Sequence, residues 1–175
     1  MRIIAGKHRG RVLAQFGGMD IRPTPDRVKE SLFQILSSKL IGARVLDLFC
    51  GSGALGLECL SRGSREAVFN DSSKESLLLL KKNLTALKET GTVYNLDYKA
   101  CLLRAEGKFD LIFCDPPYAQ DYLEGILSLV AERNLLKEGG LVVYESEREQ
   151  PQVEGWERAD ERKYGRTRVT LWKRV

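Results

Sequence analysis

The chain has 175 residues, of which 43% are hydrophobic and 30% are charged, a composition typical of one soluble globular domain with a full core. No apolar run approaches the roughly 20 residues that a membrane-spanning helix needs, and the first residues lack the layout of a signal peptide, so we expect a cytoplasmic protein. The net charge of +4 is unevenly spread, because residues 1–30 and 157–175 each hold seven Lys or Arg against three Asp or Glu. Two basic ends around an acidic centre suit a polyanionic partner, but they also suit ordinary solvated charge.

Cysteine and histidine are too sparse to suggest a metal site. The chain has four cysteines without a C-x-x-C pair and a single histidine, His8. Three of the cysteines lie in or beside apolar segments, so we expect buried thiols rather than metal ligands. Acid–base catalysis by histidine would depend on His8 alone.

The N-terminus is predicted to form a short hairpin with a basic tip. Residues 2–5 and 11–14 flank a turn of glycines and polar residues at 6–10. A single hairpin is only marginally stable, so it must dock on the domain or on a partner. We expect residues 1–20 to be an extension of a domain that covers residues 21–175.

The segment after this hairpin is predicted to begin a helix that runs to about Ser38. Thr24 is a suitable N-cap, Pro25 suits the first helical position, and Asp26 favours the positive end of the helix. The Arg22-Pro-Thr-Pro stretch is either a rigid start to this helix or a flap that closes over a ligand.

The stretch Val45–Gly56 is the centre of the predicted site. Its apolar first half indicates a strand buried on both faces, and the residues from about Leu55 to Ser61 indicate a helix. Gly51 and Gly53 allow a sharp turn and let a ligand approach the backbone. The amides at the start of the helix would then face the crevice above the sheet.

Strand-like and helix-like segments alternate through the rest of the chain. Further strands are expected at 67–71, 92–97, 109–114 and 141–145, helices at 73–89, 99–106 and 122–133, and a closing antiparallel pair at 156–163 and 168–172. This order predicts an α/β fold with a Rossmann-like, doubly wound and mainly parallel sheet. Four acids, Asp47, Asp71, Asp97 and Asp115, would converge near the carboxyl ends of the strands.

The glycine turn matches G-x-G-x-x-G, so a nicotinamide dinucleotide is one candidate ligand. Asp47 inside the strand and the lack of a basic residue argue against it, because phosphates beside several acids are repelled. S-adenosyl-L-methionine fits better, since it has no phosphate and carries cationic sulfonium and ammonium groups. Asp47 could hold the ammonium, and Asp71, 20 residues beyond Gly51, could bind the ribose or merely cap a helix.

The tetrapeptide Asp115-Pro-Pro-Tyr118 suggests the acceptor of the reaction. Two prolines fix the backbone and remove two amide donors, so the Asp115 carboxylate and the Pro116 carbonyl can accept both hydrogens of a planar exocyclic amine. Tyr118 offers a face on which a base can stack. A base inside folded RNA would have to be unstacked to reach it.

Together these residues resemble the class I, S-adenosylmethionine-dependent amino-methyltransferases. Three further segments, Met1–Arg11, Arg22–Phe33 and Tyr164–Thr167, make the chain similar to the bacterial 16S rRNA guanine-N2 methyltransferase family over nearly its whole length. The resemblance implies a seven-stranded class I fold, rRNA methylation, and binding of 16S rRNA or the assembling small subunit. The sequence itself gives no metal-ligand spacing, and a monomer is the simplest expectation for the oligomeric state. It also implies residue roles. The catalytic residues would be Asp115, Pro116, Pro117 and Tyr118. The cofactor-binding residues would be Arg22, Thr24, Asp47, Phe49, Gly51, Ser52, Gly53, Asp71 and Asp97. The RNA-binding residues would be Arg2, Lys7, His8, Arg9 and Arg11.

Two positions depart from the usual family pattern, and three other functions remain open. Cys50 stands where the family mostly has Ala, and Asp71 where it often has Glu. The same residues could hold the amine of adenine in DNA, although no target-recognition domain is visible. A non-catalytic RNA-binding protein and an NAD-dependent oxidoreductase are the remaining alternatives.

Overall fold

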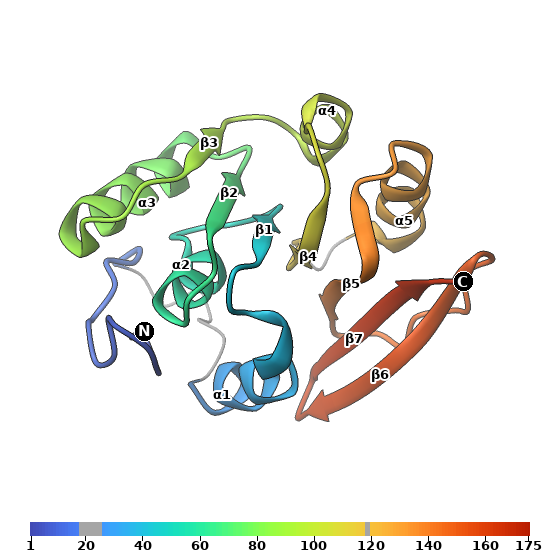
Figure 1. Ribbon diagram of the computed structural model, residues 1–175, viewed down its shortest axis with the longest axis horizontal. Helices are drawn as coiled ribbons and strands as arrows, with labels where there is room; N and C mark the ends of the chain where they lie inside the picture. The colour runs from blue at the N-terminus through green and yellow to red at the C-terminus, as the bar shows by residue number, and fades with distance from the viewer. Residues whose placement is uncertain (18–25, 118–119) are drawn as a thin grey trace.

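The computed structural model describes residues 1–17, 26–117 and 120–175, which form a three-layer α/β fold around one sheet (Figure 1). The sheet has seven strands in the order β3-β2-β1-β4-β5-β7-β6. The pairs among β1 to β5 are parallel, whereas β7 is antiparallel to both β5 and β6. The strands are β1 (Arg44–Asp47), β2 (Glu66–Asn70), β3 (Thr92–Tyr94), β4 (Phe109–Cys114), β5 (Leu136–Ser146), β6 (Trp156–Tyr164) and β7 (Thr167–Arg174).

Helices cover both faces of the sheet, and each face has its own hydrophobic cluster. The helices are α1 (Asp26–Ile35), η1 (Ser37–Lys39), α2 (Ala54–Ser61), α3 (Lys74–Leu87), α4 (Tyr98–Arg104) and α5 (Leu123–Glu132). Successive strand residues point to opposite faces, so Val45 packs with α1, α2 and α3 while Leu46 packs with α4 and α5. Both are fully buried, which explains the continuous apolar runs of the central strands.

The direction in which successive strands are added to the sheet reverses at β1. From β1 the chain proceeds outward to β2 and β3, and then crosses back to β4 on the other side of β1. The carboxyl ends of β1 and β4 flank this switch point, where open α/β sheets bind their ligands. The expected Rossmann-like, mainly parallel seven-stranded fold is confirmed.

The first residues form an arm (residues 1–17) that lies along α3. Arg2 and Val12 make one antiparallel bridge, so the predicted hairpin is present with little strand pairing. The Gly10 amide still donates to the Ile3 carbonyl, but the pairing stops at the next residues because the Ile4 and Ala5 amides donate to the Glu58 carboxylate of α2 instead. Ile3 and Leu13 are buried in the hydrophobic cluster beside α2 and α3.

Three predicted boundaries were wrong. Helix α1 ends at Ile35, and a 3-10 turn replaces its expected last residues. β3 ends at Tyr94 because Asn70 holds the next segment with its side chain, bonding both the Leu96 amide and carbonyl. β5 begins at Leu136, well before the Gly139-Gly140 pair that was expected to precede it.

All four cysteines are buried free thiols, which confirms the expectation for the three that lie in or beside apolar segments. No helix within the described ranges is both long and apolar enough to cross a membrane.

Candidate active site

A cleft of about 830 Å³ opens at the carboxyl ends of the parallel strands. This volume is in the range of sites for small molecules and cofactors. Its described lining comprises Phe16, Phe49, Gly51, Asp71, Ser72, Ser76, Asp97, Tyr98, Asp115, Pro116, Pro117, Tyr122, Glu147 and Arg166. Four of these residues are acidic and only Arg166 is basic, so the cleft favours a cationic ligand over a phosphate.

The glycine turn after β1 requires glycine at two positions. Gly51 and Gly53 have φ values of 54° and 91°, which side chains rarely tolerate. A Cβ atom on Gly53 would also lie 2.4 Å from the Leu80 side chain of α3. The turn therefore brings the backbone against α3 and leaves the Gly51 amide at the cleft.

Asp47, the last residue of β1, lies beneath this turn rather than on the cleft surface. Only 2% of Asp47 is exposed, and its carboxylate accepts a hydrogen bond of 3.0 Å from the Gly56 amide in the first turn of α2. Burial raises the pKa of Asp47 to about 7, and the nearby Asp115 and Asp71 act in the same direction. Asp47 thus holds the start of α2 against β1.

Asp71 fixes the other side of the turn. One of its carboxylate oxygens accepts from the Gly51 amide and the other from the Ser73 amide, both at 2.8 Å. Ser73, not Asp71, is the N-cap of α3. Each carboxylate oxygen can accept a second hydrogen bond, so Asp71 can still bind hydroxyls in the cleft.

Aromatic rings form the wall beyond Asp71. Phe49, Tyr98 and Tyr122 contact one another with ring centroids 5.2 to 5.9 Å apart, and all three line the cleft. Asp97 lies beside them, where its side chain caps α4 by accepting from the Ala100 amide. A flat heterocycle could stack on this wall with polar contacts to Asp97.

Asp115, Pro116 and Pro117 follow β4 directly and separate two cavities. Burial raises the pKa of Asp115 to about 7. Pro116, Pro117 and Glu147 line the main cleft and also a smaller pocket of about 210 Å³ towards the end of β5. The smaller pocket is lined further by polar side chains, among them Gln120, Ser146 and Arg148. Ligands in the two cavities would therefore approach each other at Pro116 and Pro117, with Asp115 on the side of the main cleft.

The structure brings together most of the residues that the sequence singled out. Of the predicted cofactor and catalytic residues, Phe49, Gly51, Asp71, Asp97, Asp115, Pro116 and Pro117 line the cleft, whereas Asp47, Ser52 and Gly53 do not. Arg22, Thr24 and Tyr118 lie outside the described residues. Sequence reasoning missed Phe16, Ser72, Ser76, Tyr98, Tyr122 and Glu147 as lining residues. Arg166 had a signal, since it belongs to the Tyr164–Thr167 segment.

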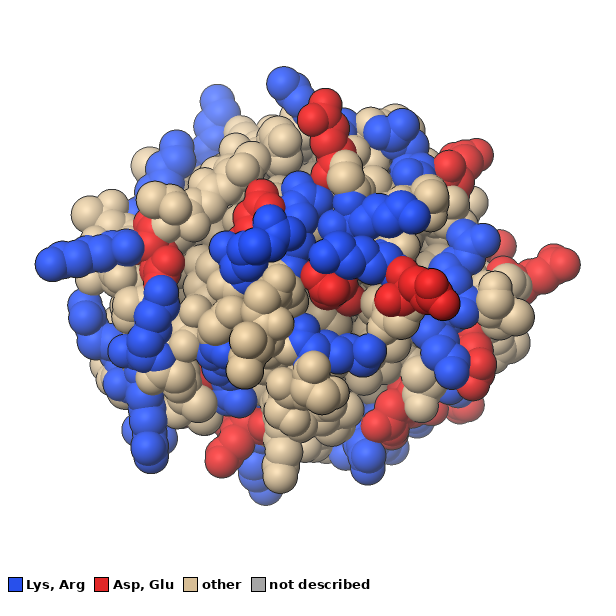
Figure 2. Space-filling model, viewed as in Figure 1, with Lys and Arg blue, Asp and Glu red and all other residues tan. Residues whose placement is uncertain are grey.

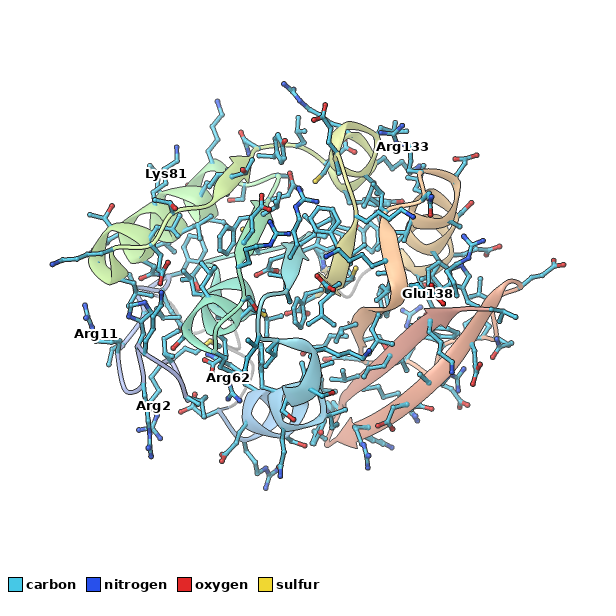
Figure 3. All side chains as sticks on the ribbon, in the orientation of Figure 1. Arg2, Arg11, Arg62, Lys81, Arg133 and Glu138 are labelled. Carbon is cyan, nitrogen blue, oxygen red and sulfur yellow. The ribbon has the colours of Figure 1, made fainter. Side chains whose placement is uncertain are left out.

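The predicted RNA-binding residues lie on the arm, where Figure 3 labels Arg2 and Arg11, and most of them already have partners. Arg2 pairs with Asp26, and Arg11 donates to the Ala86 carbonyl of α3. Lys7 and His8 both contact Glu89, at 2.5 and 2.8 Å. These contacts hold the tip of the arm at the far end of α3 from the cleft.

A sequence model of the family described as "Conserved hypothetical protein 95" matches residues 1–173. The chain belongs to this family. It is 42% identical to Bacillus subtilis YlbH over 85% of this chain and 84% of that protein. It is 39% identical to the Haemophilus influenzae "Ribosomal RNA small subunit methyltransferase D" over 89% of this chain and 84% of that protein.

The family likeness extends to solved structures and settles the fold class. The structure of the Escherichia coli protein yhhF has a TM-score of 0.89 and 35% identity, and covers 99% of this chain and 97% of that one. The shared region therefore includes the arm as well as the sheet. The fold is that of the class I methyltransferases.

Proposed function

We propose that this protein is an S-adenosyl-L-methionine-dependent rRNA methyltransferase that methylates the exocyclic N2 amine of a guanine in 16S rRNA. The observation that carries the proposal is that Pro116 and Pro117 line both the acidic cleft and the smaller pocket, while Asp115, directly before them, lines the cleft. Membership of a family with relatives named as small-subunit rRNA methyltransferases supports the choice of RNA as substrate.

The residues of the cleft fit S-adenosyl-L-methionine, which would supply the methyl group. Asp71 would bind the ribose hydroxyls, and Asp97 with Phe49 and Tyr98 would hold the adenine. The acidic lining would stabilise the cationic sulfonium and ammonium groups. Because Asp47 is buried under the turn, its role would be to position that turn and to contribute negative charge from below.

The target base would occupy the smaller pocket. The Asp115 carboxylate and the Pro116 carbonyl would accept the two hydrogens of its amine, which directs the nitrogen lone pair towards the cleft. A C–N bond then forms as the C–S bond breaks, and the nitrogen afterwards loses a proton. The raised pKa of Asp115, about 7, suits a group that receives this proton. Positioning of this kind can supply roughly 7–11 kcal/mol of the barrier.

The arm would bind the RNA substrate. In this proposal residues 1–20 are an RNA-binding extension of a methyltransferase domain at 21–175. Arg9 is the most suitable phosphate ligand, because it is exposed and has no ion pair among the described residues, whereas Arg2, Lys7, His8 and Arg11 would act from tethered positions.

The test is methylation of a 16S rRNA fragment with a methyl-labelled cofactor, followed by digestion to nucleosides. The expected product is N2-methylguanosine. Label found only in N6-methyladenosine from DNA would refute the proposal, and absence of transfer to any nucleic acid would favour a non-catalytic protein. Asp115→Ala should abolish transfer while cofactor affinity, measured by calorimetry, stays nearly unchanged. A large loss of cofactor affinity would contradict the role assigned to Asp115.

A further inference from the structure

The arm runs antiparallel to α3, so its basic tip lies far from the cleft. His8 contacts Glu89, just after α3, and Arg11 contacts Ala86. Ala14 then exchanges hydrogen bonds with Asn83, and Phe16 reaches the cleft beside Ser76. The 13 residues from Ser76 to Glu89 correspond to about 20 Å at about 1.5 Å per helical residue. An RNA held by both the tip and the cleft must cross this distance.

Four lysines on the outside of α3 occupy the gap. Lys74 and Lys81 are seven residues apart and therefore lie along one side of the helix, with Lys82 next to Lys81. Lys88 is the C-cap that ends α3, in a left-handed conformation. Lys74 lies between Ser72 and Ser76, which line the cleft, and Lys88 precedes Glu89, which anchors the tip. The α3 lysines (Lys74, Lys81, Lys82 and Lys88) thus connect the two sites.

These lysines differ from most basic residues of the protein in having no partner. All four are exposed, and none makes a side-chain hydrogen bond or ion pair within the part of the chain that the structure describes. Many other basic side chains are paired, as in Arg44–Glu66, Lys137–Asp110 and Arg168–Glu161, although Arg9 on the arm has no ion pair among the described residues.

The acids near the α3 lysines do little to cancel this charge. Glu89 is already bonded to Lys7 and His8, and these contacts hold its pKa below the usual value. Glu75 is exposed in the first turn of α3, about 100° round the helix from Lys74. Figure 2 shows Lys and Arg side chains gathered at the edge of the molecule where the arm and α3 lie in Figure 1, and Figure 3 shows Lys81 projecting into solvent.

We propose that the α3 lysines bind the RNA backbone and lead it from the arm tip to the catalytic cleft. The chemistry that fits an unpaired row of ammonium groups is a row of phosphates. At about 3.4 Å per nucleotide of a duplex strand, the 20 Å between tip and cleft corresponds to about six nucleotides. The inference rests on the proposed function, because it concerns the RNA of that same reaction.

The test compares two variants of equal charge. Lys81→Gln with Lys82→Gln removes two charges from the middle of α3, and glutamine keeps the helix propensity. The matched control, Lys108→Gln with Lys173→Gln, removes two charges from exposed lysines at the opposite end of the strands from the cleft, where Lys173 pairs with the exposed Glu157. Each variant is titrated with a 16S rRNA fragment at 50 and 200 mM KCl, and cofactor affinity is measured in parallel.

The α3 variant should lower the log–log salt slope by about 1.4–1.8 for two lost phosphate contacts, and the control should leave it unchanged. Over this fourfold range of salt, the wild-type affinity should therefore fall about 7- to 12-fold more than that of the α3 variant. Cofactor affinity should be equal in all three proteins. Equal slopes for the α3 variant and the control would overturn the inference, while the proposed function would stand if the wild type still methylates RNA. A wild type that neither binds nor methylates RNA would overturn both.

Discussion

The buried carboxylate of Asp47 should make the protein less stable as the pH rises. Burial raises its pKa from 3.8 to about 7, so the folded state binds more protons than the unfolded state between these two values. The contribution of Asp47 to stability is full below about pH 4, declines as the pH rises towards 7, and is lost above it. Between pH 5 and pH 7 the loss amounts to roughly 2 kcal/mol, at about 1.36 kcal/mol per pKa unit.

Asp47→Asn tests this because an amide oxygen can still accept the hydrogen bond from the Gly56 amide. The free energy of unfolding is measured by urea titration at pH 5 and pH 8, without cofactor. The wild type should lose stability between the two values, and the variant should lose roughly 2–3 kcal/mol less. The pKa of Asp115 is also raised to about 7 and its charge acts on Asp47, so Asp115→Asn is measured in parallel to find its share of the decline. Equal losses in the wild type and Asp47→Asn would refute the assignment.

Three further predictions concern the scaffold and the arm. Gly53→Ala should destabilise the protein by about 2–5 kcal/mol in urea titration, since it adds backbone strain and a clash with Leu80; a loss below about 1 kcal/mol would contradict this. Glu58→Ala should cost about 3–5 kcal/mol because it leaves the fully buried Lys29 unpaired, whereas Glu66→Ala, at a more exposed pair, should cost no more than about 1 kcal/mol. Arg9→Gln should reduce the salt slope of RNA binding by about 0.7–0.9, and an unchanged slope would exclude a phosphate contact.

The site residues that directly follow a single buried strand could be predicted from the sequence. The glycine turn and the acids at 71, 97 and 115 each come directly after a buried apolar run, so the parallel sheet brings them to one edge. The family resemblance then supplied the ligand and the chemistry that these positions suit.

The rest depended on how distant segments meet. Tyr98 and Tyr122 are ordinary helix-terminal residues in the sequence, and only the packing of α4 beside α5 brings both against Phe49. Asp47 looked like a ligand contact because it precedes the glycines, but it is the last strand residue and its side chain points beneath the turn. The direction of the arm along α3 could not be predicted from the sequence either, because it depends on the pairing of His8 with Glu89 and of Ala14 with Asn83.

Asn83 connects the arm to the glycine turn, and so links the segment proposed to bind RNA with the segment proposed to bind the cofactor. Its side chain, 2% exposed, bonds both the amide and the carbonyl of Ala14, and its amide group also donates to the Ser52 carbonyl in the glycine turn. A shift of the arm along α3 would break the bonds to Ala14 and leave the buried side-chain oxygen of Asn83 and the partly buried backbone groups of Ala14 without these partners, at up to about 1–3 kcal/mol for each. The segment proposed to hold RNA is therefore fixed in register with the turn proposed to hold the cofactor. The Asn83 side chain therefore orders both the arm and the glycine turn.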